Sequence, residues 1–229
     1  MINTPKIYKM RVVFTAPAHW DHKQIFVSLR NMVLRSGLPF EPAKVNKNWP
    51  RLAYGPVLGY GQQSLAEYAD VYFSSAVKEE AAESAFTQAA PKGLKIKRIK
   101  RVPYALPSVN QLAEVMLYGV EGDFSHYKPS QPAEAFFGGE HIILTEQAAN
   151  AIKVQRDLKP FLHSVKQVSP NKLHLLLQRC ADKSAKPEHM VAAWLDIAVP
   201  AEAEFTLERL KFIREALYWR DAAGELHVI

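Results

Sequence analysis

Residues 49–58 have the sequence WPRLAYGPVL, and residues 67–71 have the sequence EYADV. Pro50 opens an apolar run that Gly55 and Pro56 bring to an end, and an acidic, aromatic run comes next. Runs bounded by proline and glycine are typical of β-strands. The sequence therefore predicts strands over residues 51–58 and 67–74, joined by a turn at residues 59–61.

The flanking segments complete a βαββαβ order. Apolar alternation predicts a strand over residues 7–14, and helical spacing predicts a helix over residues 22–36 with Asp21 as its N-cap. A second helix is predicted over residues 78–89 and a last strand over residues 94–102. This order is the ferredoxin-like motif.

A second, more irregular copy is predicted to follow. Its expected strands are residues 115–120, 140–145, 151–157, 173–179, 212–219 and 226–229, and its expected helices are residues 132–137 and 188–197. We therefore expect an α+β chain with two tandem ferredoxin-like halves built on antiparallel sheets. Residues 1–106 form the first half and residues 107–229 the divergent second half, with the junction at residues 103–107.

Composition sets limits on the class of protein. The chain has 229 residues, of which 48% are hydrophobic and 23% charged, as in ordinary globular proteins. It contains no apolar run of the roughly 18 residues that a membrane helix needs, and no signal-peptide pattern at its start. Cys180 is the one cysteine, which excludes an internal disulfide and a cysteine-built zinc site. We expect a cytoplasmic protein without a membrane association.

The net charge of +6 is concentrated in the first half. Residues 1–60 hold nine lysines and arginines against Asp21 and Glu41, and residues 92–101 hold six and no acid. A basic module of this kind favours an anionic partner, and the partner we expect is nucleic acid. The residues predicted to contact nucleic acid are Arg11, Lys44, Lys47, Arg51, Lys95, Lys97, Arg98, Lys100 and Arg101.

The strand over residues 94–102 has two interpretations. Its alternation breaks at Lys97 and Arg98, which predicts a bulge or an exposed edge, and edge lysines prevent strands from pairing between molecules. Alternatively, these cations form a phosphate-contacting stripe on a four-stranded sheet, a common RNA platform. The aromatic pair typical of such a platform is not evident on the predicted strands.

Few residues suggest catalysis. His19, Asp21 and His22 stand together at a helix start and are compatible with a metal or acid/base site, or with a capping aspartate between two surface histidines. The six other histidines show no ligand spacing, and Cys180 is expected to be a buried hydrophobe. The sequence has no nucleotide-binding glycine loop, no nucleophile elbow and no cysteine triad for a radical SAM iron–sulfur cluster. No metal or cofactor is expected to be bound by this chain.

Residues from Ile7 to Val120, and more loosely to the end, resemble the radical-SAM-linked domain family. The positions that carry the resemblance are His22, Pro50, Arg51, Gly55, Pro56, Leu58, Glu67, Tyr68 and Asp70. Residues 43–51, here called the divergent loop, depart from the glycine-rich family pattern and keep only Pro50 and Arg51 of it. The resemblance implies a partner, a radical SAM protein often encoded beside or fused to such domains.

Three functions follow as hypotheses. The first is a non-catalytic accessory module that binds RNA or a ribonucleoprotein substrate for the radical SAM partner. The second is an RNA-processing enzyme with His22 as general acid/base. The third is a protein–protein scaffold acting through Trp49, Tyr54 and Tyr60. The retained Glu67 and Asp70 lie three apart on a strand and point to opposite faces, so they are a poor match for a catalytic carboxylate pair, and they also suit a purely structural role.

Overall fold

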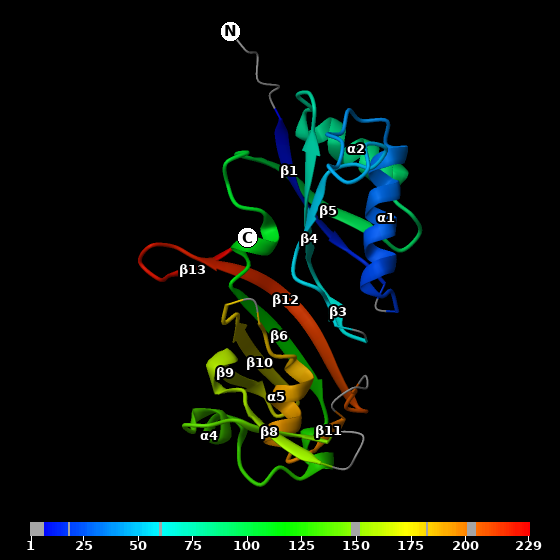
Figure 1. Cartoon of the computed structure of the whole chain (residues 1–229). Coiled ribbons are helices and arrows are strands. Elements are labelled where there is room, and N and C mark those ends of the chain that lie inside the picture. The colour runs from blue at the N-terminus through cyan, green and yellow to red at the C-terminus, as the bar shows by residue number, and fades with distance from the viewer. Residues whose placement is uncertain (1–6, 18, 60, 148–151, 182, 201–204) are drawn as a thin grey trace. The chain divides into compact units, whose positions relative to one another are not determined.

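The computed structural model describes residues 7–17, 19–59, 61–147, 152–181, 183–200 and 205–229. It divides the chain into two compact units (Figure 1). The first comprises residues 1–60 and 64–113 with Ile229, and the second comprises residues 61–63 and 114–228. The predicted junction at residues 103–107 lies inside the first unit.

The first unit is a four-stranded antiparallel sheet with two helices on one face (Figure 1). The strand order is β2-β4-β1-β5, and every neighbouring pair is antiparallel, which is the ferredoxin-like arrangement that the sequence predicts. Its elements are β1 (Tyr8–Thr15), α1 (His22–Arg35), β2 (Leu52–Tyr54), β4 (Glu67–Phe73), α2 (Glu79–Ala89), β5 (Lys95–Val102) and α3 (Val109–Leu112).

The core of this unit lies between the sheet and the helices. Alternate residues of β1 and β4, such as Val12 and Val71, pack against Leu29 and Met32 of α1 and Phe86 of α2. The helices bury one stripe each because their apolar residues recur at helical spacing.

Asp21 starts α1 through a capping box, as the sequence predicts. Its carboxylate accepts from the Gln24 backbone N–H at 2.7 Å, and the Gln24 side chain accepts from the Asp21 N–H at 2.9 Å.

Strand β2 is shorter than predicted. The sequence predicts a strand over residues 51–58, whereas β2 ends at Tyr54. The Gly55 N–H still donates to the Tyr68 carbonyl at 2.9 Å, but Pro56 has no N–H with which to continue the ladder.

The second unit repeats the ferredoxin-like order with additions. Within its main sheet the order β12-β6-β10-β9 is antiparallel throughout, and helices α4 and α5 stand at the two crossover positions of the chain order. The elements are β6 (Val115–Gly122), α4 (Ala133–Gly138), β9 (Leu162–Ser169), β10 (Lys172–Gln178), α5 (Pro187–Trp194) and β12 (Leu210–Arg220). Strand β13 (Leu226–Val228) extends this sheet beside β12, and β3 (Gln63–Ser64) also pairs with β12.

The additions correct one sequence-based expectation. The strands predicted over residues 140–145 and 151–157 do pair, as β7 (Ile143–Gln147) and β8 (Lys153–Asp157), although residue 151 lies outside the described residues. They belong to a separate small sheet with β11 (Val199–Pro200), and β9, which the sequence did not predict, takes their place beside β10. Two 3₁₀ turns, η1 (Phe124–Tyr127) and η2 (Lys159–Phe161), complete the unit.

Among the described residues, no helix combines the length and the apolar character needed to cross a membrane.

Candidate functional site

Arg11 and Asp70 form a buried ion pair on the sheet face opposite the helices. They stand directly across from each other on β1 and β4. Nε and Nη2 of Arg11 donate to the two Asp70 carboxylate oxygens at 2.8 and 3.1 Å, and the Val109 N–H donates to the same carboxylate at 2.9 Å. Asp70 is 0% exposed and Arg11 7%. Arg11 is therefore not available to a phosphate group, in contrast to the sequence-based prediction.

Residues 103–113 cover this face of the sheet. The Lys9 ammonium donates to the Leu106 carbonyl, and the Tyr104 ring packs edge-on against Tyr72 with centroids 6.2 Å apart. Lys9 and Tyr72 are both buried as a result. The open-sheet platform used by many RNA-binding ferredoxin-like domains is thus closed in this structure.

Strand β5 is both an edge strand and bulged, as its sequence predicts. It ends the strand order beside β1, and its register shifts where Val13 pairs with Arg98 and Phe14 pairs with Ile96, which leaves Lys97 as the extra residue. The exposed cations of β5 are Lys95, Lys97, Arg98, Lys100 and Arg101. Exposure of this kind is compatible with edge protection and with phosphate binding.

The basic residues do not form one continuous stripe. Strands β5 and β2 are opposite edges of the sheet, three strand spacings or about 14 Å apart. Arg51 precedes β2 and lies on that side, and its guanidinium sits 4.2 Å above the Tyr72 ring. The buried Arg11 lies between the two edges and does not connect them. The cations predicted to act together therefore separate into a β5 group and a β2 group.

The β2 group lines a cleft of about 490 Å³ between α1 and the divergent loop. Its cations are Arg30, Lys44 and Arg51, and its aromatic residues are Phe26, Trp49 and Tyr54. Ala43, Val45, Pro50 and Leu52 complete the walls. None of these lining residues is acidic. This cleft, hereafter the basic cleft, is lined by three basic residues and by no acidic one, and the Arg51 guanidinium itself lies over the Tyr72 and Tyr104 rings.

The divergent loop is held in shape by its own backbone. The Ala43 N–H donates to the Trp49 carbonyl at 2.8 Å, and the Trp49 N–H donates to the Asn46 carbonyl at 3.0 Å. These bonds place Lys44 on the wall of the basic cleft, whereas Lys47 is exposed on the turn and is not part of the wall. The loop is therefore a structured hairpin that presents side chains to a ligand at little ordering cost.

Arg30 and Trp49 pack against each other in the wall of the cleft. The Arg30 guanidinium carbon lies 4.2 Å from the centre of the Trp49 ring, and Trp49 remains 41% exposed. An exposed indole with a cation beside it offers a stacking surface for a planar group and a charge for an anionic one. Arg30 lies on α1 and is not among the cations that the sequence predicts to contact nucleic acid.

The floor of the cleft is an aromatic ladder. The rings of His22 and Phe26, and those of Phe26 and Tyr54, each have centroids 3.7 Å apart. The Tyr54 hydroxyl donates to the Phe26 carbonyl at 3.2 Å, and burial raises the pKa of Tyr54 to about 12 against the opposing effect of Arg30. His22 thus stands at the helix start beside the cleft, and its role as an acid/base stays a prediction.

The family-motif positions on β4 are buried in the first unit, as residues with a structural role are. Glu67, Tyr68 and Asp70 are all buried, and Glu67 and Asp70 alternate along one strand toward opposite faces, as predicted. Pro50 is buried and pairs with Pro42 at the base of the divergent loop. Gly55, Pro56 and Leu58 follow β2 in the segment that leaves the sheet. Tyr60, proposed as a scaffold residue, lies outside the described residues.

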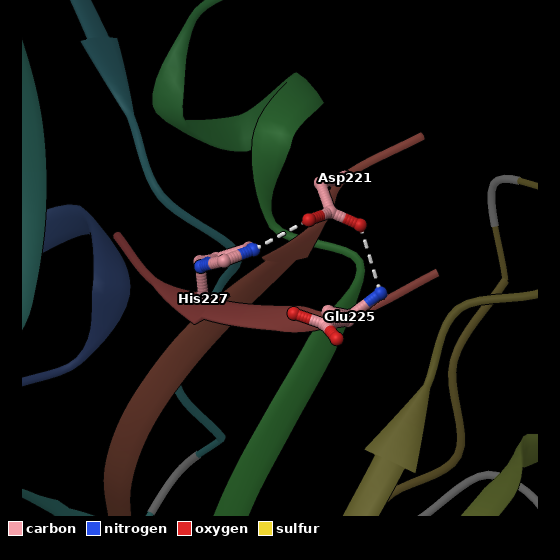
Figure 2. A group of neighbouring side chains, drawn as sticks. All are labelled: Asp221, Glu225 and His227. Atoms are coloured by element: carbon pink, nitrogen blue, oxygen red, sulfur yellow. Dashed lines mark hydrogen bonds and ion pairs between the residues drawn. The ribbon is translucent and has the colours of Figure 1, made fainter. Parts of the chain in front are cut away.

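One group of potential metal ligands occurs in the described part of the chain. Asp221, Glu225 and His227 bring ligand atoms within 4.8 Å of one another at the turn between β12 and β13 (Figure 2). Asp221 already accepts from the Ala223 and Glu225 N–H groups at 2.9 Å each and contacts His227 Nε2 at 2.8 Å. The His227 hydrogen bond is the main cause of the lowered pKa of Asp221. The group therefore closes a hairpin.

The remaining sequence candidates are dispersed. His19 is exposed before α1 and shares no ligand group with His22. Cys180 is partly exposed rather than buried, with its Sγ 3.0 Å from the Pro160 carbonyl, because it follows the end of β10 instead of lying inside it.

The comparisons with known proteins give a family without an activity. None of the curated proteins compared with the chain matches it. The family model that matches is described as an uncharacterized protein conserved in bacteria (DUF2344), and it covers residues 18–187. That range contains α1, the divergent loop and β2, and hence the whole basic cleft. Since the match covers most of the sequence, the chain belongs to the DUF2344 family.

Proposed function

We propose that this protein is a non-catalytic accessory module that binds single-stranded RNA in the basic cleft. The observation that carries the proposal is that Arg30, Lys44 and Arg51 line, together with an exposed Trp49, one cavity that has no lining carboxylate. Cations that follow a phosphate backbone, combined with an aromatic stacking surface, are the usual means of binding single strands.

The cleft suits a single strand better than a duplex. Its volume of about 490 Å³ accepts a nucleotide, whereas a duplex needs an extended surface that spans successive grooves. Stacking of one base on Trp49 is worth about 1–3 kcal/mol. Because residues 103–113 cover the open face of the sheet, we assign the RNA contacts to the β2 edge.

Salt dependence follows from the number of cations. Three phosphates neutralised on a single strand give a slope of about −2 in log affinity against log salt concentration. Affinity should therefore fall about fifteenfold between 50 and 200 mM salt.

Fluorescence anisotropy with a labelled 12-nucleotide RNA tests the stacking contact. Trp49→Ala should weaken binding about tenfold or more, and Trp49→Phe, which keeps an aromatic face, should retain most of the affinity. Two results would refute the assignment of RNA to this cleft: a slope near zero in log affinity against log salt concentration, or equal affinities for the wild type and Trp49→Ala.

We further propose that the module serves a radical SAM protein. Support comes from the resemblance of His22, Pro50–Arg51, Gly55–Pro56 and the Glu67–Asp70 strand to the radical-SAM-linked domains. A tagged pull-down from the native host, followed by mass spectrometry, should recover an identified radical SAM protein. Recovery of none, from cells shown to express one, would count against the partner while leaving the RNA proposal to its own test.

A further inference from the structure

A second cavity lies in the first unit, where the start of β1 meets the end of β5. Its volume is about 380 Å³. Ile7, Val102 and Pro103 form apolar walls, the rings of Tyr8 and Tyr104 add aromatic surface, and Lys9 and Arg101 supply the charges. None of these lining residues is acidic.

Lys9 is the unusual member of the cavity because it is a nearly inaccessible cation. It is 1% exposed, and its one hydrogen bond among the described residues is to the Leu106 carbonyl. An ammonium group carries three donors. Two donors of a buried charge are therefore left for a partner other than the described protein groups, and buried polar donors are as a rule satisfied.

The charge around Lys9 is unbalanced. Asp70 is the nearby carboxylate, but its oxygens already accept from Arg11 and Val109. Arg51 adds another cation on the same side. Burial is the largest cause of the lowered pKa of Lys9, with Arg11 and Arg51 acting in the same direction against Asp70. Several cations thus share one carboxylate under the covering segment.

Arg101 brings a further charge to the cavity mouth. Its guanidinium carbon lies 4.7 Å from the centre of the Tyr8 ring, and no ion pair engages it among the described residues. The carboxylate of Glu79 on α2 accepts from the Arg101 backbone N–H at 2.7 Å, not from the guanidinium. The side chain therefore keeps its donors for a ligand.

We propose that this cavity is a binding site for a phosphate group, held by the Lys9 ammonium and the Arg101 guanidinium. Such an anion would balance the excess positive charge, take up the remaining Lys9 donors and sit against apolar walls that strengthen its interaction with both cations. The site is separate from the basic cleft and does not rest on RNA binding. Inorganic phosphate and a phosphomonoester share this chemistry.

Isothermal titration calorimetry of the full chain with inorganic phosphate, at constant ionic strength, tests the proposal. Lys9→Met should lower the affinity about tenfold to a hundredfold, the range expected for charge-assisted hydrogen bonds. Lys95→Met, at the far end of β5, is the matched control and should leave the affinity unchanged. Sodium acetate should bind more weakly than phosphate.

Further arms keep the test decisive. Arg101→Met should also weaken phosphate binding, and it serves in place of Lys9→Met if that variant does not fold. The cleft variant Lys44→Glu should bind phosphate as the wild type does. If methyl phosphate binds more tightly than inorganic phosphate, the apolar walls contact the ester group and the site is one for a phosphomonoester. If methyl phosphate binds more weakly, the site is one for inorganic phosphate.

Three results would overturn the proposal. The first is that the wild type shows no heat of binding at 10 mM phosphate, which is roughly the weakest affinity of a specific site. The second is that acetate binds as tightly as phosphate. The third is that Lys44→Glu loses phosphate binding while Lys9→Met keeps it.

Discussion

Asp70→Ala should destabilise the first unit strongly because the carboxylate is the common partner of buried groups. The substitution removes two hydrogen bonds from Arg11 and one from the Val109 N–H, at a residue that is 0% exposed. It also leaves the guanidinium of Arg11 and the ammonium of Lys9 buried without the compensating charge. Removing one member of a buried ion pair costs about 3–5 kcal/mol.

That loss is a large fraction of the roughly 5–15 kcal/mol that stabilises a typical domain. Urea unfolding followed by circular dichroism should show a lower midpoint, with the free energy of unfolding reduced by about 3–5 kcal/mol. Asp70→Asn should cost a similar amount, because an amide presents donors where Arg11 and Val109 also donate.

A triple variant separates charge burial from packing. Lys9→Met, Arg11→Met and Asp70→Leu together replace the buried charges by apolar groups, so the triple variant should be more stable than Asp70→Ala. A loss of less than about 1 kcal/mol in the free energy of unfolding of Asp70→Ala would contradict a buried, stabilising ion pair, since that is the range of exposed pairs. A triple variant less stable than Asp70→Ala would show that the network is required for packing as well.

Two further predictions concern the second unit. The hydrogen bond from His141 is the main cause of the low pKa of Asp157, which is about 2. The stability that this pairing contributes is therefore present above pH 3.8 and is lost as the pH falls through about 2. NMR of the Asp157 carboxyl carbon should show a titration midpoint near that pH, and His141→Ala should raise the midpoint. Gly122→Ala should lower the free energy of unfolding by about 3 kcal/mol, because the residue has φ +151° and a Cβ would lie 2.1 Å from the Arg209 carbonyl oxygen. Gly138→Ala is the control: a Cβ there would meet no atom within 4 Å, so urea unfolding should show nearly unchanged stability. An ordinary Asp157 midpoint, or equal stabilities for the two glycine variants, would contradict these accounts.

Local patterns predict much of the fold. The strands around Gly55–Pro56, the α1 cap at Asp21 and the bulge at Lys97 all follow from short-range rules on turns, caps and alternation. The tandem ferredoxin-like order follows from the sequence of elements. Strand β9 could not be predicted in this way, because Leu162–Ser169 is largely exposed and carries polar residues on both faces. It therefore shows no apolar alternation.

The candidate site depends on contacts between distant residues, which the sequence does not reveal. Arg11 meets Asp70 only through the pairing of β1 with β4, although a charged residue within an otherwise apolar strand is itself a sign of a buried partner. Arg30 joins Lys44 and Trp49 because the divergent loop folds back toward α1. Charge counting found the basic half but could not separate its two edges.

The most direct test of the RNA proposal compares charge reversals at those two edges. Affinity for a labelled single-stranded RNA is measured by anisotropy at 50 mM salt for wild type, Lys44→Glu/Arg51→Glu at the basic cleft, and Lys95→Glu/Lys97→Glu at β5, which carries the same change in charge. We expect the cleft variant to lose at least about thirtyfold in affinity and the β5 variant to lose less than about threefold, since direct phosphate contacts outweigh distant charge. Equal losses in both variants, or a larger loss at β5, would contradict the assignment of RNA binding to the basic cleft.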